Sequence, residues 1–415
     1  MREMKDSGLQ WAGNIPQYWN IAKGKHFMAV LERPVRDDDN VITCFRNGEV
    51  TLRSNRREDG FTVATVEAGY QGIEPGDLVV HGMDGFAGAI GISDSRGKGT
   101  PALNVLSCSE NKKYIMYLLR AMAYTEVFMA LSTGIRVRTC DTNWKKLKSL
   151  DYLIPPADEQ QCIADFLNAK CAEIDALTAD IQTQIDTLEQ YKRSVITETV
   201  TKGLNPNAEM KDSGIQWIGN MPAHWDVVRG KYILHYMQKP VREDDGVITC
   251  FRDGEVTLRS NRREDGFTMS DKEIGYQGID VGDLVVHGMD GFAGSIGISD
   301  SRGKASPVLN VLDTDQCKRY IMYYLRSMAY SDVFIALATG IRVRSCDLRW
   351  NKLAELSYPV PPLNEQNAIV KYIDSVLSKA DAVIADKKAQ LATLDEYKKS
   401  LIFEYVTGKK EVPVS

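Results

Sequence analysis

The chain has 415 residues, and 43% of them are hydrophobic, which is ordinary for a globular protein and allows about two to four domains with cores of their own. No apolar run approaches the roughly 20 residues of a membrane span, and the first residues lack the apolar stretch of a secretion signal, so we expect a cytoplasmic protein without membrane contact. The formal net charge of −5 argues against a protein that binds nucleic acid through its own charge alone.

The chain begins twice. The residues MKDSGLQWAGNIPQYW at Met4–Trp19 return as MKDSGIQWIGNMPAHW at Met210–Trp225, an offset of 206 residues. The offset holds without a gap toward the end of the chain, where Tyr191 matches Tyr397. One unit is therefore written twice, and the function must be one that a tandem duplicate performs better than a single copy.

The first part of each repeat mixes strand and helix patterns. Short β-branched segments bounded by Gly or Asp predict strands at 41–45, 77–82 and 89–93. Apolar residues at helical spacing predict a helix over 114–132, and Asp141 is expected to cap the short helix that follows it. The residues YLIPP at 152–156 predict a last strand, which the two prolines end.

After the prolines the pattern becomes purely helical. From Asp158 to Thr199 there is no Pro or Gly, and a seam of residues at alternating three- and four-residue spacings predicts a helix of about 60 Å. The seam of the first repeat is Leu167, Cys171, Ile174, Thr178, Ile181, Ile185, Leu188, Lys192 and Val195, and that of the second is Ile373, Leu377, Ala380, Ile384, Lys387, Leu391, Leu394, Lys398 and Leu401. We expect the two helices to bury their seams against each other, although a core helix or a dimerisation stalk would show the same stripe. The stripe alone leaves their relative direction open.

No motif for catalysis, metal or cofactor binding is found. The eight cysteines include no CxxC pair, and Cys44, Cys250, Cys140 and Cys346 sit among apolar neighbours, which predicts buried, reduced thiols. The chain lacks a GxxxxGK[ST] loop, GxSxG and HExxH, and its PP dipeptides lack the polar and aromatic flanks of an adenine methyltransferase. We therefore expect a protein with no catalytic residue, no metal and no cofactor.

Three polar loops in each repeat are candidates for contact with DNA. Arg forks read guanine edges and phosphates, Asn reads adenine, and Gly-flanked turns project side chains toward a ligand. A solvated or ion-paired loop is the alternative for each set taken alone. The candidates are Arg53, Asn55, Arg56, Arg57, His81, Asp84, Arg136 and Arg138 in the first repeat, and Arg259, Asn261, Arg262, Arg263, His287, Asp290, Arg342 and Arg344 in the second. Residues 20–156 hold 18 Lys and Arg against 16 Asp and Glu, so a partner should supply much of the phosphate contact.

The doubled globular part, the doubled helix and the prolines at each junction resemble the specificity subunit of a type I restriction–modification system, over all 415 residues. The most specific pieces are the opening motif, the junctions YLIPPADEQQCIADFL and YPVPPLNEQNAIVKYI, and the helix ends YKRSVITETVTKGLNPN and YKKSLIFEYVTGK.

The resemblance implies an α+β fold with a pseudo-two-fold internal repeat. Two mixed α/β target recognition domains, 1–156 and 206–362, would be separated by helices 157–205 and 363–410, paired as an antiparallel coiled coil. Each domain would read one half of a split site in double-stranded DNA. The helices would set the spacer and dock two methyltransferase subunits, and restriction subunits would join for cleavage. The chain itself would carry no catalytic residue.

The two recognition domains are near copies here, whereas those of one family member normally differ. Residues 41–62 recur at 247–268 with a single change, from Asn47 to Asp253. Two like readers favour an interrupted palindrome as the target. Two other classes remain open: a coiled-coil scaffold whose globular ends bind proteins, and a self-sufficient nuclease or methyltransferase.

Overall fold

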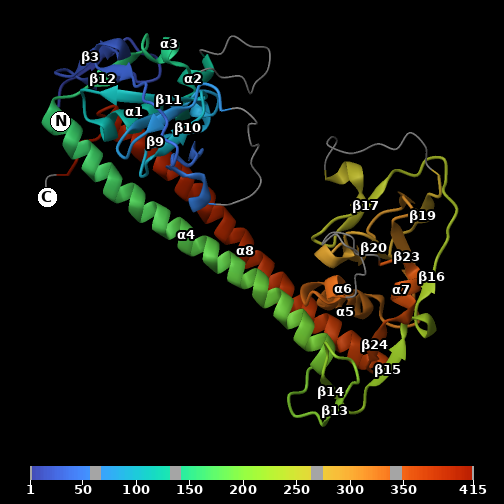
Figure 1. Ribbon diagram of the computed structural model, residues 1–415. Helices are drawn as coiled ribbons and strands as arrows, with labels where there is room; N and C mark the ends of the chain where they lie inside the picture. The colour runs from blue at the N-terminus through green and yellow to red at the C-terminus, as the bar shows by residue number, and fades with distance from the viewer. Residues whose placement is uncertain (1, 57–66, 131–141, 263–273, 337–347, 414–415) are drawn as a thin grey trace. The chain divides into compact units, whose positions relative to one another are not determined.

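The computed structural model describes residues 2–56, 67–130, 142–262, 274–336 and 348–413. The chain divides into two compact units, and each is described by itself. The first comprises residues 1–181 and 388–415, and the second comprises residues 182–387 (Figure 1). Over the described ranges, no helix is both long and apolar enough to cross a membrane.

The first unit is built on a four-stranded antiparallel sheet in the order β4-β11-β8-β9, with four two-stranded pairs around it: β1-β2, β3-β12, β5-β6 and β7-β10. Its strands are β1 (Met4–Asp6), β2 (Asn14–Pro16), β3 (Asn20–Lys23), β4 (Met28–Val30), β5 (Ile42–Cys44), β6 (Val50–Leu52), β7 (Gln71–Ile73), β8 (Leu78–His81), β9 (Ile90–Ile92), β10 (Gly97–Gly99), β11 (Leu103–Cys108) and β12 (Asp151–Ile154). Its short helices are α1 (Lys112–Tyr124), α2 (Val127–Ala130) and α3 (Trp144–Leu147), with one-turn helices η1 (Gly24–His26), η2 (Arg53–Asn55) and η3 (Gly85–Ala87).

The second unit repeats this arrangement. Its sheet has the order β16-β23-β20-β21, and the pairs are β13-β14, β15-β24, β17-β18 and β19-β22. Its strands are β13 (Met210–Asp212), β14 (Asn220–Pro222), β15 (Asp226–Arg229), β16 (His235–Tyr236), β17 (Ile248–Cys250), β18 (Val256–Leu258), β19 (Gln277–Ile279), β20 (Leu284–His287), β21 (Ile296–Ile298), β22 (Gly303–Ala305), β23 (Leu309–Asp313) and β24 (Ser357–Val360). Its short helices are α5 (Lys318–Tyr330), α6 (Val333–Ala336) and α7 (Trp350–Glu355), with η4 (Gly230–Tyr232), η5 (Arg259–Asn261) and η6 (Gly291–Ala293).

The predicted strands are confirmed, as β5, β8, β9 and β12, but two helix predictions need correction. The helix expected over 114–132 is two helices, because α1 ends at Tyr124 and Glu126 adopts a left-handed backbone with φ of 59°. The short helix α3 is capped by Asn143, whose side chain accepts a hydrogen bond from the Lys146 N–H, and not by Asp141. Asp141 itself lies outside the described residues.

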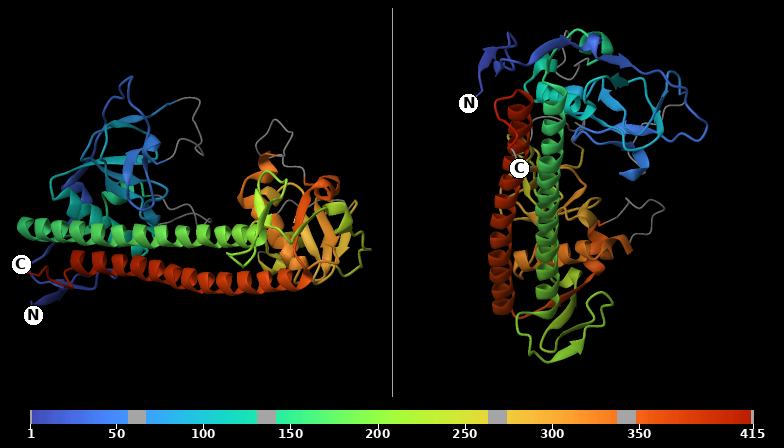
Figure 2. Two further views of the ribbon diagram at one scale, coloured as in Figure 1. Left: turned by 90° about the horizontal axis from the view of Figure 1, so that it is seen from below. Right: turned by 90° about the vertical axis from the view of Figure 1, so that its left-hand side faces the viewer.

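The long helices α4 (Ala157–Lys202) and α8 (Leu363–Val406) pair antiparallel within each unit. In the first unit, the Phe166 and Tyr405 rings lie 4.4 Å apart, and the Lys398 Nζ lies 2.5 Å from the Asp175 carboxylate. A later residue of α4 thus meets an earlier residue of α8. Figure 2 shows the two helices side by side.

The same ion pair recurs in the second unit. Lys192 Nζ lies 2.6 Å from the Asp381 carboxylate, and Lys387 bonds to Gln184. Lys192 and Asp381 are the repeat equivalents of Lys398 and Asp175. The seam lysines that break the apolar stripe therefore reach out to the partner helix, while seam residues such as Ile181 and Ile384 are buried.

The core of each unit is closed by the end of the other repeat's long helix. In the first unit, Tyr405 and Val406 of α8 belong to the same core as Trp19 and Tyr114, and the Tyr114 hydroxyl donates to the Val406 carbonyl at 3.3 Å. In the second unit, the Tyr320 hydroxyl donates to the Val200 carbonyl of α4 at 3.1 Å. Each globular part is therefore completed by residues from the other repeat.

The junction motifs lock the start of each long helix onto its globular part. Glu159 accepts a hydrogen bond from the buried Trp19 indole N–H at 2.9 Å. Gln160 accepts from the Asn111 backbone N–H at 3.0 Å and donates to the Pro155 carbonyl at 2.9 Å. The second unit repeats these bonds with Glu365 and Gln366. Glu and Gln in these motifs thus have a structural role.

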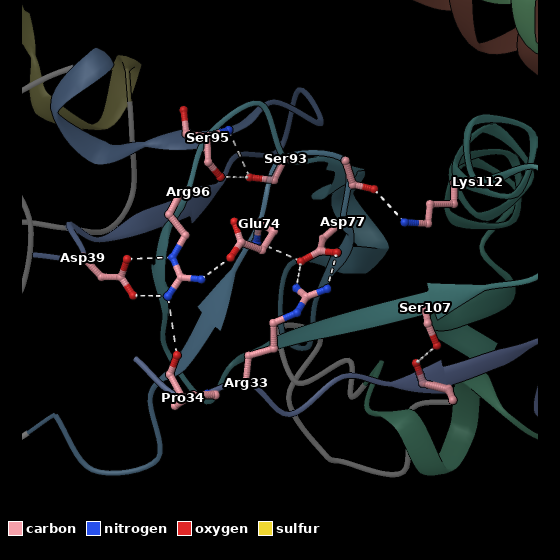
Figure 3. Close-up of polar contacts among 12 residues, drawn as sticks. Arg33, Pro34, Asp39, Glu74, Asp77, Ser93, Ser95, Arg96, Ser107 and Lys112 are labelled. Carbon is pink, nitrogen blue, oxygen red and sulfur yellow. Dashed lines mark hydrogen bonds and ion pairs between the residues drawn. The ribbon is translucent and has the colours of Figure 1, made fainter. Parts of the chain in front are cut away.

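An ionic network fixes the segment after β4 onto the turn before β8 (Figure 3). Arg33 holds both oxygens of the buried Asp77, and Arg96 holds both oxygens of the buried Asp39 at 2.6 and 2.7 Å while also bonding to Glu74. The Arg96 hydrogen bonds lower the pKa of Asp39 to about 2. In the second unit Lys239 replaces Arg33, and Arg302 holds Asp245 at 3.1 Å.

Cys44 and Cys250 are buried free thiols, as predicted, and burial raises the pKa of each to about 12. Cys140 and Cys346 lie outside the described residues.

Candidate nucleic-acid interface

The hairpin between β5 and β6 presents two polar side chains at its tip. The Gly48 N–H donates to the Phe45 carbonyl and the Phe45 N–H to the Glu49 carbonyl, both at 2.8 Å, which closes a tight turn. Gly48 has a positive φ of 86°, which a turn of this kind requires at that position. The turn leaves Arg46 and Asn47 exposed at the tip.

A buried arginine anchors this tip on helix α1. The Arg120 guanidinium, only 8% exposed, donates to the Gly48 carbonyl at 2.9 Å and to the Ile90 carbonyl at 2.8 Å. A side chain at position 48 would collide with it, because a Cβ there would lie 1.8 Å from the Arg120 Nη2. In the second unit Arg326 donates to the Ile296 carbonyl at 2.8 Å and to the Asp253 carbonyl of the tip at 3.4 Å. The tips are held before any ligand arrives.

The turn after β8 holds a histidine in one tautomer. The His81 Nδ1 accepts hydrogen bonds from the Met83 and Asp84 backbone N–H groups at 3.2 and 3.0 Å, so in the neutral ring the proton is on Nε2. Burial lowers the pKa of His81, which keeps the ring neutral at pH 7. His287 has the same two bonds and the same pKa direction. Each histidine thus offers an N–H donor.

An ion pair brings the hairpin tip and the histidine turn together. Arg46 lies 2.8 Å from Asp84 in the first unit, and Arg252 lies 3.1 Å from Asp290 in the second. Both arginines are largely exposed, at 68% and 70% of their side chains, so each keeps donors for a ligand.

In the second unit these groups line one cavity of about 530 Å³. The residues around it are Thr249, Cys250, Phe251, Arg252, Asp253, Arg262, His287, Asp290 and Ser295. Three residues predicted from sequence, Arg262, His287 and Asp290, are therefore brought together in space although the chain separates them.

The arginine that follows the hairpin stacks on its aromatic residue. The Arg56 guanidinium lies 4.5 Å from the Phe45 ring centroid, and that of Arg262 lies 4.2 Å from the Phe251 ring centroid. Arg262 also pairs with Asp253 at 2.7 Å and with Glu255 at 3.2 Å, whereas Arg56 pairs with Glu49 at 3.4 Å.

Other predicted residues are tied into the hairpin itself. The Asn55 amide donates to the Thr51 hydroxyl at 2.8 Å, and the Asn261 amide to the Thr257 hydroxyl at 2.8 Å. Arg53 and Arg259 donate to Thr43 and Thr249 at 3.4 and 3.2 Å. These four side chains shape the hairpin on which the exposed arginines stand.

Six predicted residues lie outside the described part of the chain: Arg57, Arg136, Arg138, Arg263, Arg342 and Arg344. Thr142 is the first described residue after 131–141. Its hydroxyl oxygen lies 2.9 Å from each of the His81 and Gly82 carbonyl oxygens, between which its single hydrogen is shared. Thr142 therefore lies beside the histidine turn.

The residues at the hairpin tip, Arg46, Asn47, Arg252 and Asp253, were not predicted as site residues. The signal was present, since FRNG and FRDG place an Asx–Gly turn between two strand patterns, which is a hairpin signature. Among the described residues, no group of three or more His, Cys, Asp or Glu side chains could hold a metal ion.

No family model matches the chain. It is 25% identical over 444 aligned positions to the "Putative type I restriction enzyme MjaX specificity subunit" of Methanocaldococcus jannaschii, which covers 96% of this chain and 95% of that protein. It is 19% identical over 427 positions to the "Type I restriction enzyme StySPI specificity subunit" of Salmonella potsdam, covering 96% and 90%. A structure solved in a study of complex assembly and conformational transition of the type I R-M system has a TM-score of 0.66 at 13% identity, covering 95% of this chain and 99% of that one.

The fold and the repeated polar surface define a duplicated α+β protein with paired long helices, and the solved structure shares that fold. The chain is a homologue of type I restriction enzyme specificity subunits, and the resemblance predicted from its motifs is confirmed.

Proposed function

We propose that the chain is the DNA-recognition subunit of a type I restriction–modification complex. Each globular part reads one half of a bipartite site in double-stranded DNA. The long helices set the distance between the halves and dock methyltransferase subunits, to which restriction subunits are added. The chain itself is not catalytic, and chemistry on the DNA belongs to its partners.

The observation that carries the proposal is the repetition of one polar arrangement. In both units an anchored hairpin tip, a neutral histidine and an Arg–Asp pair meet on loops: Arg46, His81 and Asp84 in one, and Arg252, His287 and Asp290 in the other. Arginine forks, an imidazole N–H donor and a carboxylate acceptor are groups that distinguish base edges. Because these loops rest on a rigid sheet, they are pre-organised for readout.

The helix pair also offers an apolar patch in each unit. Leu177 and Tyr397 are 47% and 55% exposed in the first unit, and Val383 and Tyr191 are 44% and 49% exposed in the second. Each residue directly precedes a seam position, so the two members of a pair lie on the same flank of an antiparallel pair. Exposed Tyr beside an aliphatic side chain is typical of a protein-binding surface. Two equivalent patches suit two copies of one methyltransferase subunit.

Two like readers on an antiparallel helix pair should recognise two like half-sites in inverted orientation. The target is then an interrupted palindrome with one methylated adenine on each strand.

The test is methylome sequencing of cells that carry the chain together with its methyltransferase subunit. We expect adenine methylation at one bipartite, inverted site, and none in cells that carry the methyltransferase subunit alone. The purified chain should neither methylate nor cut DNA. Methyl transfer by the chain alone would support the self-sufficient enzyme instead. Absence of specific duplex binding when the methyltransferase is present would support the protein-binding scaffold.

A further inference from the structure

The two units differ at one atom of their hairpin tips. Asn47 and Asp253 occupy equivalent positions, and they provide the single difference between residues 41–62 and 247–268. The Asn47 Oδ1 accepts the Glu49 N–H at 3.2 Å, and the Asp253 Oδ1 accepts the Glu255 N–H at 3.1 Å. The same turn therefore fixes both side chains in the same orientation.

The remaining atom of each side chain is of opposite hydrogen-bonding type. Because Oδ1 of Asn47 is bonded to the backbone, its Nδ2 is the atom left at the tip, and it can only donate. The corresponding atom of Asp253 is Oδ2, which can only accept, and it does accept from Arg262 at 2.7 Å. A carboxylate oxygen has capacity for more than one donor, so this bond leaves room for another.

A second difference lies in the same cavity. Ser295 replaces Ala89, and the residue is 1% exposed. Ser295 is one of the residues that line the cavity, and its buried Oγ has no hydrogen-bond partner among the described residues. A buried hydroxyl normally has a partner, so this cavity is suited to receive a polar group from a ligand. Of the nine lining residues, the other seven are the same in the first repeat.

We propose that the difference between Asn47 and Asp253 makes the two globular parts read one base pair differently. This rests on the proposed function and deepens it. The second unit selects cytosine at that position, since the N4 amino group of cytosine donates to an Asp carboxylate in the major groove. The first unit rejects cytosine there and takes a base whose major-groove edge offers an acceptor to Asn47. The site is then an interrupted palindrome with one departure from symmetry.

The test is selection of randomised duplexes by the full chain bound to its methyltransferase subunits. We expect the wild-type half-sites to mirror each other except at one position, with cytosine enriched about tenfold or more in one half. Asn47→Asp should bring cytosine into the half-site that the first unit reads. Asp253→Asn should remove cytosine from the half-site that the second unit reads. Either variant should therefore remove the asymmetry at that position.

A matched control separates base reading from a general charge effect. Asn205 also accepts a backbone N–H, from Asn207 at 3.0 Å, and it lies away from the hairpin tip. Asn205→Asp adds the same charge with the same turn, and it should leave both half-sites unchanged.

Three results would overturn the inference. A wild-type site that is already fully symmetric would do so while leaving the proposed function intact. So would an Asn47→Asp variant that loses affinity equally for all sequences, because that is a charge effect on phosphate contact. If no sequence is enriched at all, the proposed function itself fails.

Discussion

The first and second units share the hydrogen bonds that build their fold and differ at positions both on the surface and in the core. Bonds that build the fold are duplicated almost atom for atom, from the Trp–Glu bond at each junction to the tyrosine that reaches the other repeat's helix end. Some differences fall where side chains face solvent or a cavity, as at Asn47 and Asp253, and others replace one buried side chain by another, as at Leu118 and Tyr324. The repeated bonds therefore mark residues that fold both units, whereas an exposed difference such as that between Asn47 and Asp253 is free to change what each unit binds.

Because the core of each unit includes the end of the other repeat's long helix, one repeat alone should be unable to fold as a monomer. Without α8, the first unit lacks four buried side chains, Leu401, Ile402, Tyr405 and Val406. At about 1.5–3 kcal/mol each, their loss amounts to roughly 6–12 kcal/mol, which is comparable to the stability of a whole domain.

A fragment of residues 1–203 can recover this loss only by pairing with a second copy. Val195, Ile196 and Val200 would then take the places of Leu401, Ile402 and Val406. We expect a two-fold dimer in analytical ultracentrifugation, and a fragment with Ile196→Asp should be monomeric and poorly protected in hydrogen exchange. A monomeric fragment whose backbone amides are as well protected from hydrogen exchange as those of the full chain would show that the core does not need the other repeat's helix end.

Changing helix length tests whether the two units act as readers held at a fixed distance. Four residues inserted after Thr183 and after Ala389, which are repeat equivalents, lengthen each helix by about 6 Å. We expect the preferred spacer to grow by roughly one or two base pairs, with the half-site bases unchanged, in a binding assay on duplexes of graded spacing. Binding that stays confined to the original spacing would argue against a ruler.

The arginines of the segment before Thr142 are expected to contribute next most strongly. Replacing Arg136 and Arg138 with Ala should weaken specific binding by about 1–3 kcal/mol for each contact to a base. The matched change at Arg342 and Arg344 shows whether the second unit depends equally on its copy. A uniform loss across sequences, with a salt slope lower by roughly one per Arg, would indicate phosphate contact instead. A folded double variant with unchanged affinity for DNA would show that Arg136 and Arg138 do not contribute to DNA binding.

Periodicity explains what the sequence could predict. Strands and seam positions follow from the two- and 3.6-residue spacing of apolar side chains, so β5, β8 and the buried Ile181 and Ile384 were found. Nothing local reports that Tyr114 bonds to Val406, which is 292 residues away. The helix break at Glu126 could not be predicted either, because a left-handed backbone is uncommon for a residue other than Gly.

The candidate site shows the same division. His81, Asp84 and Arg56 were predicted from residue type and loop context, but the hairpin tip that meets them was not. Its pairing of Arg46 with Asp84 spans 38 residues and depends on how two hairpins pack. Residue type therefore finds candidates, and only packing selects which of them act together.

The smallest predicted effect is on the free energy of unfolding, and it comes from the ionic networks, which differ between the two units. Both oxygens of Asp39, whose side chain is 2% exposed, are held by Arg96, which lowers the pKa of Asp39 from 3.8 to about 2. A carboxyl group whose pKa is lowered by folding stabilises the protein above its unfolded pKa. The contribution is therefore fully present above about pH 4 and is lost as the pH falls toward 2. Its size at pH 7 is about 2 kcal/mol.

Asp39→Asn should lower the stability of the first unit by about that amount at pH 7, and the difference from wild type should shrink as the pH approaches 2. Urea-dependent oxidation of the buried Met116 and Met122 reports on the first unit at any of these pH values, and Met322 and Met328 report on the second. Asp245→Asn is the matched variant: Arg302 holds Asp245 at longer distances, 3.1 and 3.2 Å, so the second unit should lose less. A loss that is independent of pH would mean that Asp39 acts through packing and not through its charge.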